Sequence, residues 1–288
     1  MNVLVTGATG FIGTHVVNEL TYRGHNTIAL TRNKNSVPNK FVKYVYGDLC
    51  NIDCELIDQF ASYRIDSCIH LAWQGIPDFS YENCINNLNL GLNLLDLCKK
   101  LDIMNLICSG SCWEYDKPVG MINENWSLSS QNSFKSVKNS FRMIADSFCK
   151  DNNINFYWLR LFYVYGLGQR SGSLIPYIVR ELKTGKYPQL KTPFDENDFI
   201  NVQDVAEAIV NTLEIRPNEN ILNIGSGYAI PGIDILKIVA SKLNIFLDLS
   251  MYDKNSVPNR FWADISRSKK AICFEPKIKI NDGLDQVI

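Results

Sequence analysis

The stretch Thr6-Gly7-Ala8-Thr9-Gly10-Phe11-Ile12-Gly13 comes directly after a short aliphatic run, Asn2 to Thr6. Glycines at this spacing allow a tight turn between a strand and a helix. A pyrophosphate can then approach the helix N-terminus, where free N–H groups and the helix dipole favour negative charge. The spacing alone is a weak signal, and a purely structural turn is the alternative, but its place at the head of a strand–helix–strand unit favours dinucleotide binding. The predicted contacts are Gly7, Thr9, Gly10, Phe11, Ile12 and Gly13.

Beyond this turn, short β-branched runs alternate with stretches in which apolar residues recur with helical period. The predicted strands are Asn2 to Thr6, Thr27 to Thr31, Val42 to Tyr46, Ser67 to Leu71, Met104 to Ser109 and Asn155 to Leu161. The clearest helical series are Ile85, Leu88, Leu92 and Leu95, and Phe134, Val137, Phe141, Ile144 and Phe148. This alternation predicts an α/β fold, a Rossmann-type doubly wound parallel sheet covered on both faces.

After Gly166 the alternation loosens, because glycine and proline interrupt the chain more often. The elements expected here are a helix from about Gln203 to Glu214, a strand Ile221 to Ile224, a helix from about Gly232 to Leu243 and a strand near Phe246 to Met251. We predict a smaller C-terminal substrate-binding lobe that the chain enters twice. The cofactor-binding domain would comprise 1–165 plus 197–225, and the lobe 166–196 plus 226–288.

The composition is that of a globular protein, with 288 residues of which 46% are hydrophobic and 20% charged. A net charge of −1 argues against nucleic acid or an anionic membrane as the main partner. No apolar run reaches the ~20 residues of a membrane helix, and the immediate strand at Val3 to Val5 leaves no room for a signal peptide. Nine scattered cysteines beside three histidines predict a reducing, cytoplasmic location and no metal site.

The second predicted strand ends in Ala29-Leu30-Thr31-Arg32. An acidic residue at this place would bind the ribose 2′-hydroxyl of NAD, whereas an arginine offers a forked cation to the 2′-phosphate of NADP. The alternative is a solvated arginine at the entrance of a loop. We therefore predict NADP(H) as the cofactor, with Arg32 as the residue that selects it.

Further blocks occur along the whole chain in the order seen in one protein family. They are the glycine turn, Tyr46-Gly47-Asp48-Leu49, Ile69-His70-Leu71-Ala72, Arg160-Leu161-Phe162-Tyr163-Val164-Tyr165-Gly166, Asp198 to Ala206, Asn223 to Gly227 and Arg260 to Ser266. The chain resembles the extended short-chain dehydrogenase/reductases, within the sugar-nucleotide epimerase/dehydratase/reductase group. Its short length and its Thr31-Arg32 strand end look most like 4-keto-6-deoxyhexose reductases such as abequose or fucose synthases.

The resemblance implies further contacts to the cofactor. Asp48 and Leu49 would flank the adenine, and Leu71, Ala72 and Trp73 would lie along the cofactor. The remaining implied contacts are Asn87, Ser109, Lys138 and Leu161. The alternative interpretation of Asn87 is a partly buried polar residue without a role in binding.

The resemblance also places the catalytic groups. Ser111 falls on the serine or threonine that hydrogen-bonds the sugar carbonyl, with a turn serine as the alternative. Cys112 and Trp113 stand where dehydratases of the group carry an Asp-Glu pair, which disfavours a 4,6-dehydratase. Where the family has Tyr-x-x-x-Lys, this chain has Phe134 and Lys138, which share one helix face. Lys138 would bind the nicotinamide ribose and lower the pKa of the tyrosine.

Phe134 has no proton to donate, and three explanations stay open. The residue is an engineered Tyr→Phe change, which is the one we favour. Alternatively, Tyr115, Tyr163 or Glu114 has taken over its role, or the chain is a naturally inactive binder of NADP or nucleotide sugar.

Substrate contacts are implied for Ser111, Cys112, Trp113, Tyr163, Asn197 and Arg260. Asn197 replaces an arginine that usually touches the substrate diphosphate, so Arg260 would be the main cation there.

These features predict NADP(H)-dependent reduction of the C4 ketone of a nucleoside-diphosphate-linked 4-keto-6-deoxy sugar. The alternatives are an epimerase with tightly bound NAD and an inactive binder. The long helices near Tyr81 to Leu101 and Phe134 to Asp151 would pair in a homodimer, as they commonly do in the family. Dimers with twofold symmetry are also the most frequent homo-oligomers.

Overall fold

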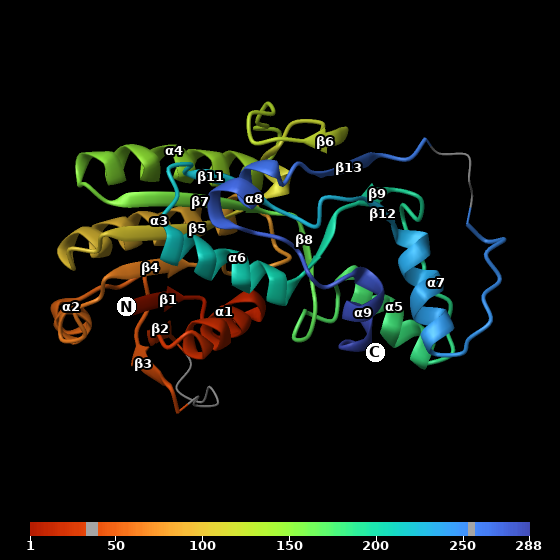
Figure 1. Cartoon of the computed structure of the whole chain (residues 1–288), viewed down its shortest axis with the longest axis horizontal. Helices are drawn as coiled ribbons and strands as arrows, with labels where there is room; N and C mark the ends of the chain where they lie inside the picture. Colours follow the sequence, from red (N-terminus) through yellow and green to blue (C-terminus); the bar gives the residue numbers. More distant parts are fainter. Residues whose placement is uncertain (33–39, 253–256) are drawn as a thin grey trace.

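The computed structural model describes residues 1–32, 40–252 and 257–288, and within them one large sheet forms the centre of the molecule (Figure 1). Its seven strands are all parallel and lie in the order β11-β7-β5-β4-β1-β2-β3. Their bounds are β1 Asn2–Thr6, β2 Asn26–Thr31, β3 Val42–Tyr46, β4 Ser67–His70, β5 Asn105–Ser111, β7 Asn155–Leu161 and β11 Ile221–Ile224. The predicted α/β doubly wound sheet is therefore confirmed.

Helices cover both faces of this sheet. One face packs against α1 (Phe11–Tyr22), α6 (Val202–Ile215) and α8 (Ser266–Ile272) through a shared apolar core. The other face packs against α2 (Cys54–Ala61), α3 (Tyr81–Lys100) and α4 (Ser133–Asp151). Strands with a helix layer on each side are buried on both faces, which is why their sequences read as nearly continuous apolar runs.

A second, smaller group of elements lies beyond the carboxyl ends of the strands (Figure 1). It contains α5 (Leu174–Lys183), α7 (Gly232–Lys242) and α9 (Ile280–Asp285), which share a separate apolar core. Short strands complete it: a pair formed by β8 (Tyr163–Tyr165) and β10 (Phe199–Asn201), and a four-stranded sheet formed by β6 (Gly120–Ile122), β9 (Glu196–Asn197), β12 (Ile230–Pro231) and β13 (Arg260–Ala263). The division into two sequence-interleaved domains stays a prediction, and β6 crosses it by pairing with β13.

The predicted strand near Phe246 to Met251 is wrong. Ile245, Leu247 and Leu249 do alternate toward the apolar core of α5 and α7, while Phe246 points out and is 88% exposed. In the described part of the chain, no strand pairs with this segment. The alternation that predicted a strand thus reflects packing of an extended segment on helices.

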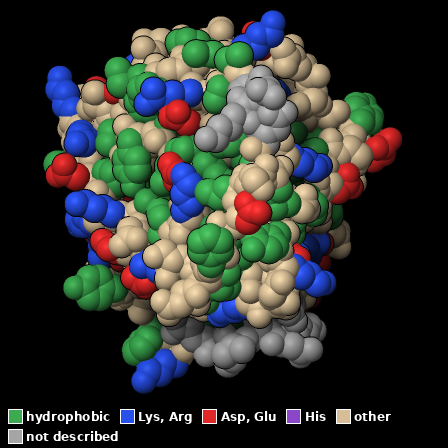
Figure 2. All heavy atoms as spheres, turned by 90° about the vertical axis from the view of Figure 1, so that its right-hand side faces the viewer, with side chains coloured by type: hydrophobic (Ala, Val, Ile, Leu, Met, Phe, Trp, Pro, Cys, Tyr) green, Lys and Arg blue, Asp and Glu red, His purple; other side chains and the backbone are tan. Residues whose placement is uncertain are grey.

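The end of the molecule formed by the small group of elements carries Lys and Arg side chains interspersed with Asp and Glu (Figure 2). Among the described residues, no helix combines the length and apolar character that a membrane crossing requires.

Candidate functional site

A cleft of about 320 Å³ opens at the carboxyl ends of β1 to β4. Strand order reverses between β1 and β4, and ligands of such sheets bind outside the strand ends at this switch point. The cleft brings together many of the residues predicted to bind the cofactor: Gly7, Thr9, Gly10, Arg32, Asp48, Leu49, Leu71, Ala72 and Trp73. Gln74 and Gly75 also line it, and sequence reasoning missed them.

The glycine turn allows close backbone packing at the base of this cleft. Gly7 has φ +74°, and a Cβ there would lie 2.7 Å from the backbone nitrogen of Ala72. A Cβ on Gly13 would lie 2.0 Å from the carbonyl oxygen of Gly7. Gly10 precedes α1 and has no side chain to cap it, so the first N–H groups of the helix stay available to an anion. Phe11 and Ile12 form that first turn, and the arrangement fits the pyrophosphate of a dinucleotide.

Arg32 lies at the rim of the cleft, with its side chain 59% exposed. Its Nη1 donates to Oε1 of Gln74 at 2.9 Å and lies 3.8 Å from Oδ2 of Asp48. The guanidinium therefore joins the ends of β2, β3 and β4 and leaves much of its surface open to a ligand.

Asn87 is buried and lies outside the lining of the cleft, and the cofactor contact that the resemblance implied stays a prediction. Its Oδ1 accepts from the backbone N–H of Gln74 at 2.7 Å, and its Nδ2 donates to the carbonyl oxygens of Gln74 and Asn83 at 3.1 and 2.8 Å. The side chain is buried and its polar groups are engaged. Asn87 thus fixes the loop that follows β4 and shapes the cleft indirectly.

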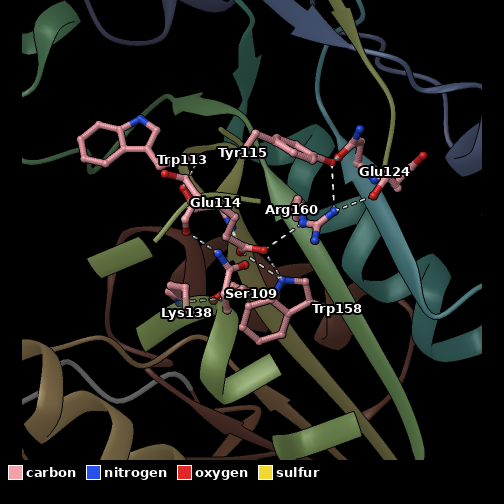
Figure 3. Close-up of polar contacts among 12 residues, drawn as sticks. Ser109, Trp113, Glu114, Tyr115, Glu124, Lys138, Trp158 and Arg160 are labelled. Atoms are coloured by element: carbon pink, nitrogen blue, oxygen red, sulfur yellow. Dashed lines mark hydrogen bonds and ion pairs between the residues drawn. The ribbon is translucent and has the colours of Figure 1, made fainter. Parts of the chain in front are cut away.

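Lys138 extends from α4 to the end of β5. Its Nζ donates to the carbonyl oxygen of Ser109 at 2.9 Å (Figure 3). Burial lowers the pKa of Lys138 to about 8, although the negative charge of Glu114 opposes this shift. Leu161 stands opposite Ser111 in the β5–β7 pairing, and its side chain is buried in the core between the sheet and α6.

Ser111 is the last residue of β5 and is held by hydrogen bonds to Glu114 and Trp113. Its backbone N–H donates to Oε1 of Glu114 at 2.7 Å, and its Oγ accepts from the backbone N–H of Trp113 at 3.2 Å. Because Oγ accepts from Trp113, its own proton is available to a carbonyl oxygen of a ligand.

The carboxylate of Glu114 is the centre of this network. It is 0% exposed, lies 2.8 Å from Nε of Arg160 and accepts from Nε1 of Trp158 at 3.0 Å. Arg160 also donates to the hydroxyl of Tyr115 and to the carbonyl oxygen of Glu124. Sequence reasoning missed Arg160, although a charged residue inside an apolar strand signals a buried partner.

Phe134 lies on the α4 face that carries Lys138 and is enclosed by aromatic rings. Its ring centroid is 5.0 Å from those of Trp73 and Phe79 and 5.9 Å from that of Trp113. We call Phe134, Trp73, Phe79 and Trp113 the aromatic cluster. Trp113 points away from the Glu114–Arg160 pair (Figure 3), and its ring contacts that of Phe134.

The structure limits which group can replace the missing tyrosine hydroxyl. Tyr115 is fully buried, its hydroxyl donates to Oδ1 of Asn223 at 2.6 Å, and burial raises its pKa to about 12. Glu114 is equally buried and paired with Arg160. Of the three candidates only Tyr163, on β8, is partly exposed, and burial raises its pKa too.

The residues implied for substrate binding are spread over the small sheet and the end of β5. Arg260 on β13 is 58% exposed, and its Nε lies 2.7 Å from Oε2 of Glu196 on β9. Asn197 follows Glu196 and stands opposite Phe261. Cys112 is buried at 3% exposure and packs into the apolar core under β6 and β13, and the substrate contact implied for it stays a prediction.

The sequence and the fold of this chain are similar to those of known proteins. Residues 3–225 match the model of the NAD dependent epimerase/dehydratase family. The chain is 28% identical over 232 residues, 79% of this chain and 85% of the relative, to dTDP-6-deoxy-L-talose 4-dehydrogenase (NAD(+)) of Aggregatibacter actinomycetemcomitans. It is 26% identical to CDP-abequose synthase of Salmonella muenchen, covering 84% of this chain and 83% of the relative. The solved structure of MoeE5 with UDP-glucose and NAD has a TM-score of 0.84 and 25% identity, over 100% of this chain and 97% of that one.

Proposed function

Because the chain belongs to the NAD-dependent epimerase/dehydratase family, as the resemblance predicted, we propose that it acts on the C4 ketone of a nucleoside-diphosphate-linked 4-keto-6-deoxy sugar with NADP(H). The relatives named above include two enzymes whose names refer to deoxysugar nucleotides, which supports this substrate class. The division into a cofactor domain and a substrate lobe is part of the same proposal.

One observation carries this proposal: the three positions that the resemblance implies as catalytic converge beside the cleft. Lys138 contacts Ser109, two residues before Ser111, and Phe134 contacts Trp113, two residues after it. The end of β5 and one face of α4 therefore form a single site, as a carbonyl-reducing centre requires.

The residues of the site have distinct roles in the proposed reaction. When bound, the reduced nicotinamide supplies a hydride to the carbonyl carbon of the sugar. Ser111 donates a hydrogen bond to the carbonyl oxygen and orients it, and Lys138 places a positive charge next to the group at position 134. Reduction also needs a proton on that oxygen, and the phenylalanine side chain has none. We therefore propose that the chain binds both ligands and turns over slowly, as an engineered Tyr→Phe variant would.

The direct test of the proposed function is binding followed by turnover. We expect NADPH and nucleoside diphosphates to bind to the purified chain, and NADPH to be oxidised only in the presence of 4-keto-6-deoxy nucleotide sugars. The matching family model covers epimerases as well as dehydratases, so an epimerase with tightly bound NAD is the second candidate. Protein purified with stoichiometric NAD and showing no net NADPH consumption would support that candidate instead.

Arg32 is expected to set the preference between NADPH and NADH. A charge-assisted contact to the 2′-phosphate exists only for NADPH and is worth about 1.5–3 kcal/mol, roughly ten- to a hundredfold in affinity. We expect Arg32→Ala to abolish the preference for NADPH and to leave NADH affinity nearly unchanged, measured by calorimetric titration of both cofactors. Equal affinity of the unmodified chain for the two cofactors would refute this assignment.

Arg260 and Glu196 are expected to have opposite effects on the substrate diphosphate. Arg260→Ala should weaken binding of a nucleoside diphosphate and flatten its salt dependence, because the main cation is removed. Glu196→Gln should strengthen binding, because Arg260 then has no ion pair with Glu196 that must break before it contacts the diphosphate. Titration with UDP and dTDP at several salt concentrations measures both effects. If neither variant changes affinity, the phosphates bind elsewhere.

The remaining parts of the proposal concern partners and location. We propose a homodimer through α3 and α4, which lie side by side on one face of the sheet (Figure 1). Tyr81, Met143 and Ile144 on these helices are exposed apolar side chains that such an interface would cover. Nine free cysteines support the proposed cytoplasmic location.

A further inference from the structure

Trp73 covers the ammonium group of Lys138. The Nζ atom of Lys138 lies 4.5 Å from the ring centroid of Trp73 on one side and 5.7 Å from that of Trp158 on another. The same atom donates to the carbonyl oxygen of Ser109. Only 8% of Lys138 is exposed, so the cation is enclosed by two indole rings and a backbone carbonyl. A cation over the face of a tryptophan is attracted to it, most strongly where water is excluded.

Trp73 also marks the boundary of the cleft. The lining comes from the glycine turn and from the ends of β2, β3 and β4, where an adenosine and the bridging phosphates would lie. Past β4 the lining continues through Trp73 to Gln74 and Gly75, on the loop that Asn87 holds. The lining does not include Lys138, whose ammonium group lies 4.5 Å from the centroid of the Trp73 ring.

We propose that Trp73 competes with the nicotinamide half of the cofactor for Lys138, so that the affinity of the chain for NADPH rests on the adenosine half. The inference rests on the proposed function, because it assumes that Lys138 meets the nicotinamide ribose. It makes Trp73 a residue that determines cofactor affinity without touching the adenosine half.

Two features make this position of Trp73 one that a ligand can displace. Its Nε1 is buried and has no hydrogen-bond partner among the described residues, which is a costly state for an N–H group. The loop backbone is anchored at the next residue, Gln74, by the amide of Asn87. Rotation of the Trp73 side chain would therefore uncover Lys138 and release the N–H group while the anchored backbone stays in place.

The test compares NADPH with its adenine half, 2′-phosphoadenosine 5′-diphosphate, by calorimetric titration. In the unmodified chain we expect the two ligands to bind with similar affinity. Trp73→Ala should tighten NADPH binding about tenfold, the size of one desolvated cation–π contact, and leave the adenine half unchanged. Trp73→Phe, a smaller change that retains a weaker aromatic face, should give an intermediate ratio and serves as the test if the alanine variant fails to fold.

Phe79→Ala is the matched control, because Phe79 packs on Phe134 and Trp113 in the same aromatic cluster. It should leave the ratio of the two affinities unchanged. The inference is overturned if NADPH already binds far more tightly than its adenine half and replacement of Trp73 weakens it or has no effect. If the chain binds neither ligand, the proposed function falls together with the inference. Tighter NADPH binding in Trp73→Ala without turnover in any variant would leave the inference standing and contradict the proposed function alone.

Discussion

Replacing Glu114 by alanine is expected to lower the free energy of unfolding by about 3–5 kcal/mol, because it leaves Arg160 charged and buried without a counterion. Both side chains are almost completely inaccessible, at 0% and 1% exposure, and their atoms lie 2.8 Å apart. The same substitution removes the acceptor for the backbone N–H of Ser111 and for Nε1 of Trp158. Thermal unfolding followed by circular dichroism should show a fall in melting temperature of roughly 10 °C.

Glu196→Gln provides the matched control for this prediction. It removes a carboxylate from an ion pair of similar length, 2.7 Å, but Arg260 in that pair is 58% exposed. Exposed pairs contribute about 0–1 kcal/mol, so this variant should unfold almost as the unmodified chain does. Glu114→Gln separates charge from shape, because it keeps an acceptor oxygen and loses the negative charge. If Glu114→Ala and Glu196→Gln destabilise the chain equally, the buried pair does not hold the end of β5 in place.

The large sheet was predictable because its strands are buried on both faces. Runs such as those of β1 and β7 are apolar enough to be recognised without any partner. The segment from Phe246 to Met251 shows the limit of this reasoning: period-two alternation also arises when an extended segment packs on helices. A segment becomes a strand only if another strand lies next to it and pairs with it through hydrogen bonds. The periodicity of the sequence does not show whether such a neighbour is present.

The candidate site shows the same limit at the level of side chains. The positions of the glycine turn and Arg32 at the cleft were predictable, because both come directly after a strand of the parallel sheet. The contacts of Asn87 were not, since they are made to the loop after β4, which has no periodic pattern of apolar residues. Nor was the contact between Trp73 and Lys138, which joins residues on two different elements. A charged residue in an apolar strand, as at Arg160, was a signal that could have been used.

Phe134→Tyr is expected to raise the rate of NADPH oxidation by about 10²–10⁴-fold, the usual contribution of a positioned general acid. The change adds one oxygen atom on the helix face shared with Lys138, whose ammonium can stabilise the phenolate that forms when the proton is given up. Affinities for NADPH and nucleotide sugar should change little, because the ring itself stays in the aromatic cluster. The measurement is initial rates of both forms on a panel of 4-keto-6-deoxy nucleotide sugars.

The pH dependence and a matched variant make this prediction specific to the hydroxyl at position 134. Because burial lowers the pKa of Lys138 to about 8, the rate of Phe134→Tyr should fall as the pH rises through that value and the ammonium loses its charge. Phe79→Tyr adds the same hydroxyl to a neighbouring ring of the aromatic cluster, but Phe79 is not on the α4 face that carries Lys138. This variant should oxidise NADPH as slowly as the unmodified chain. If the phenylalanine form is already fast and gains nothing from the hydroxyl, another group donates the proton. Tyr163 is then the residue to replace, since Tyr115 is buried and hydrogen-bonded to Asn223.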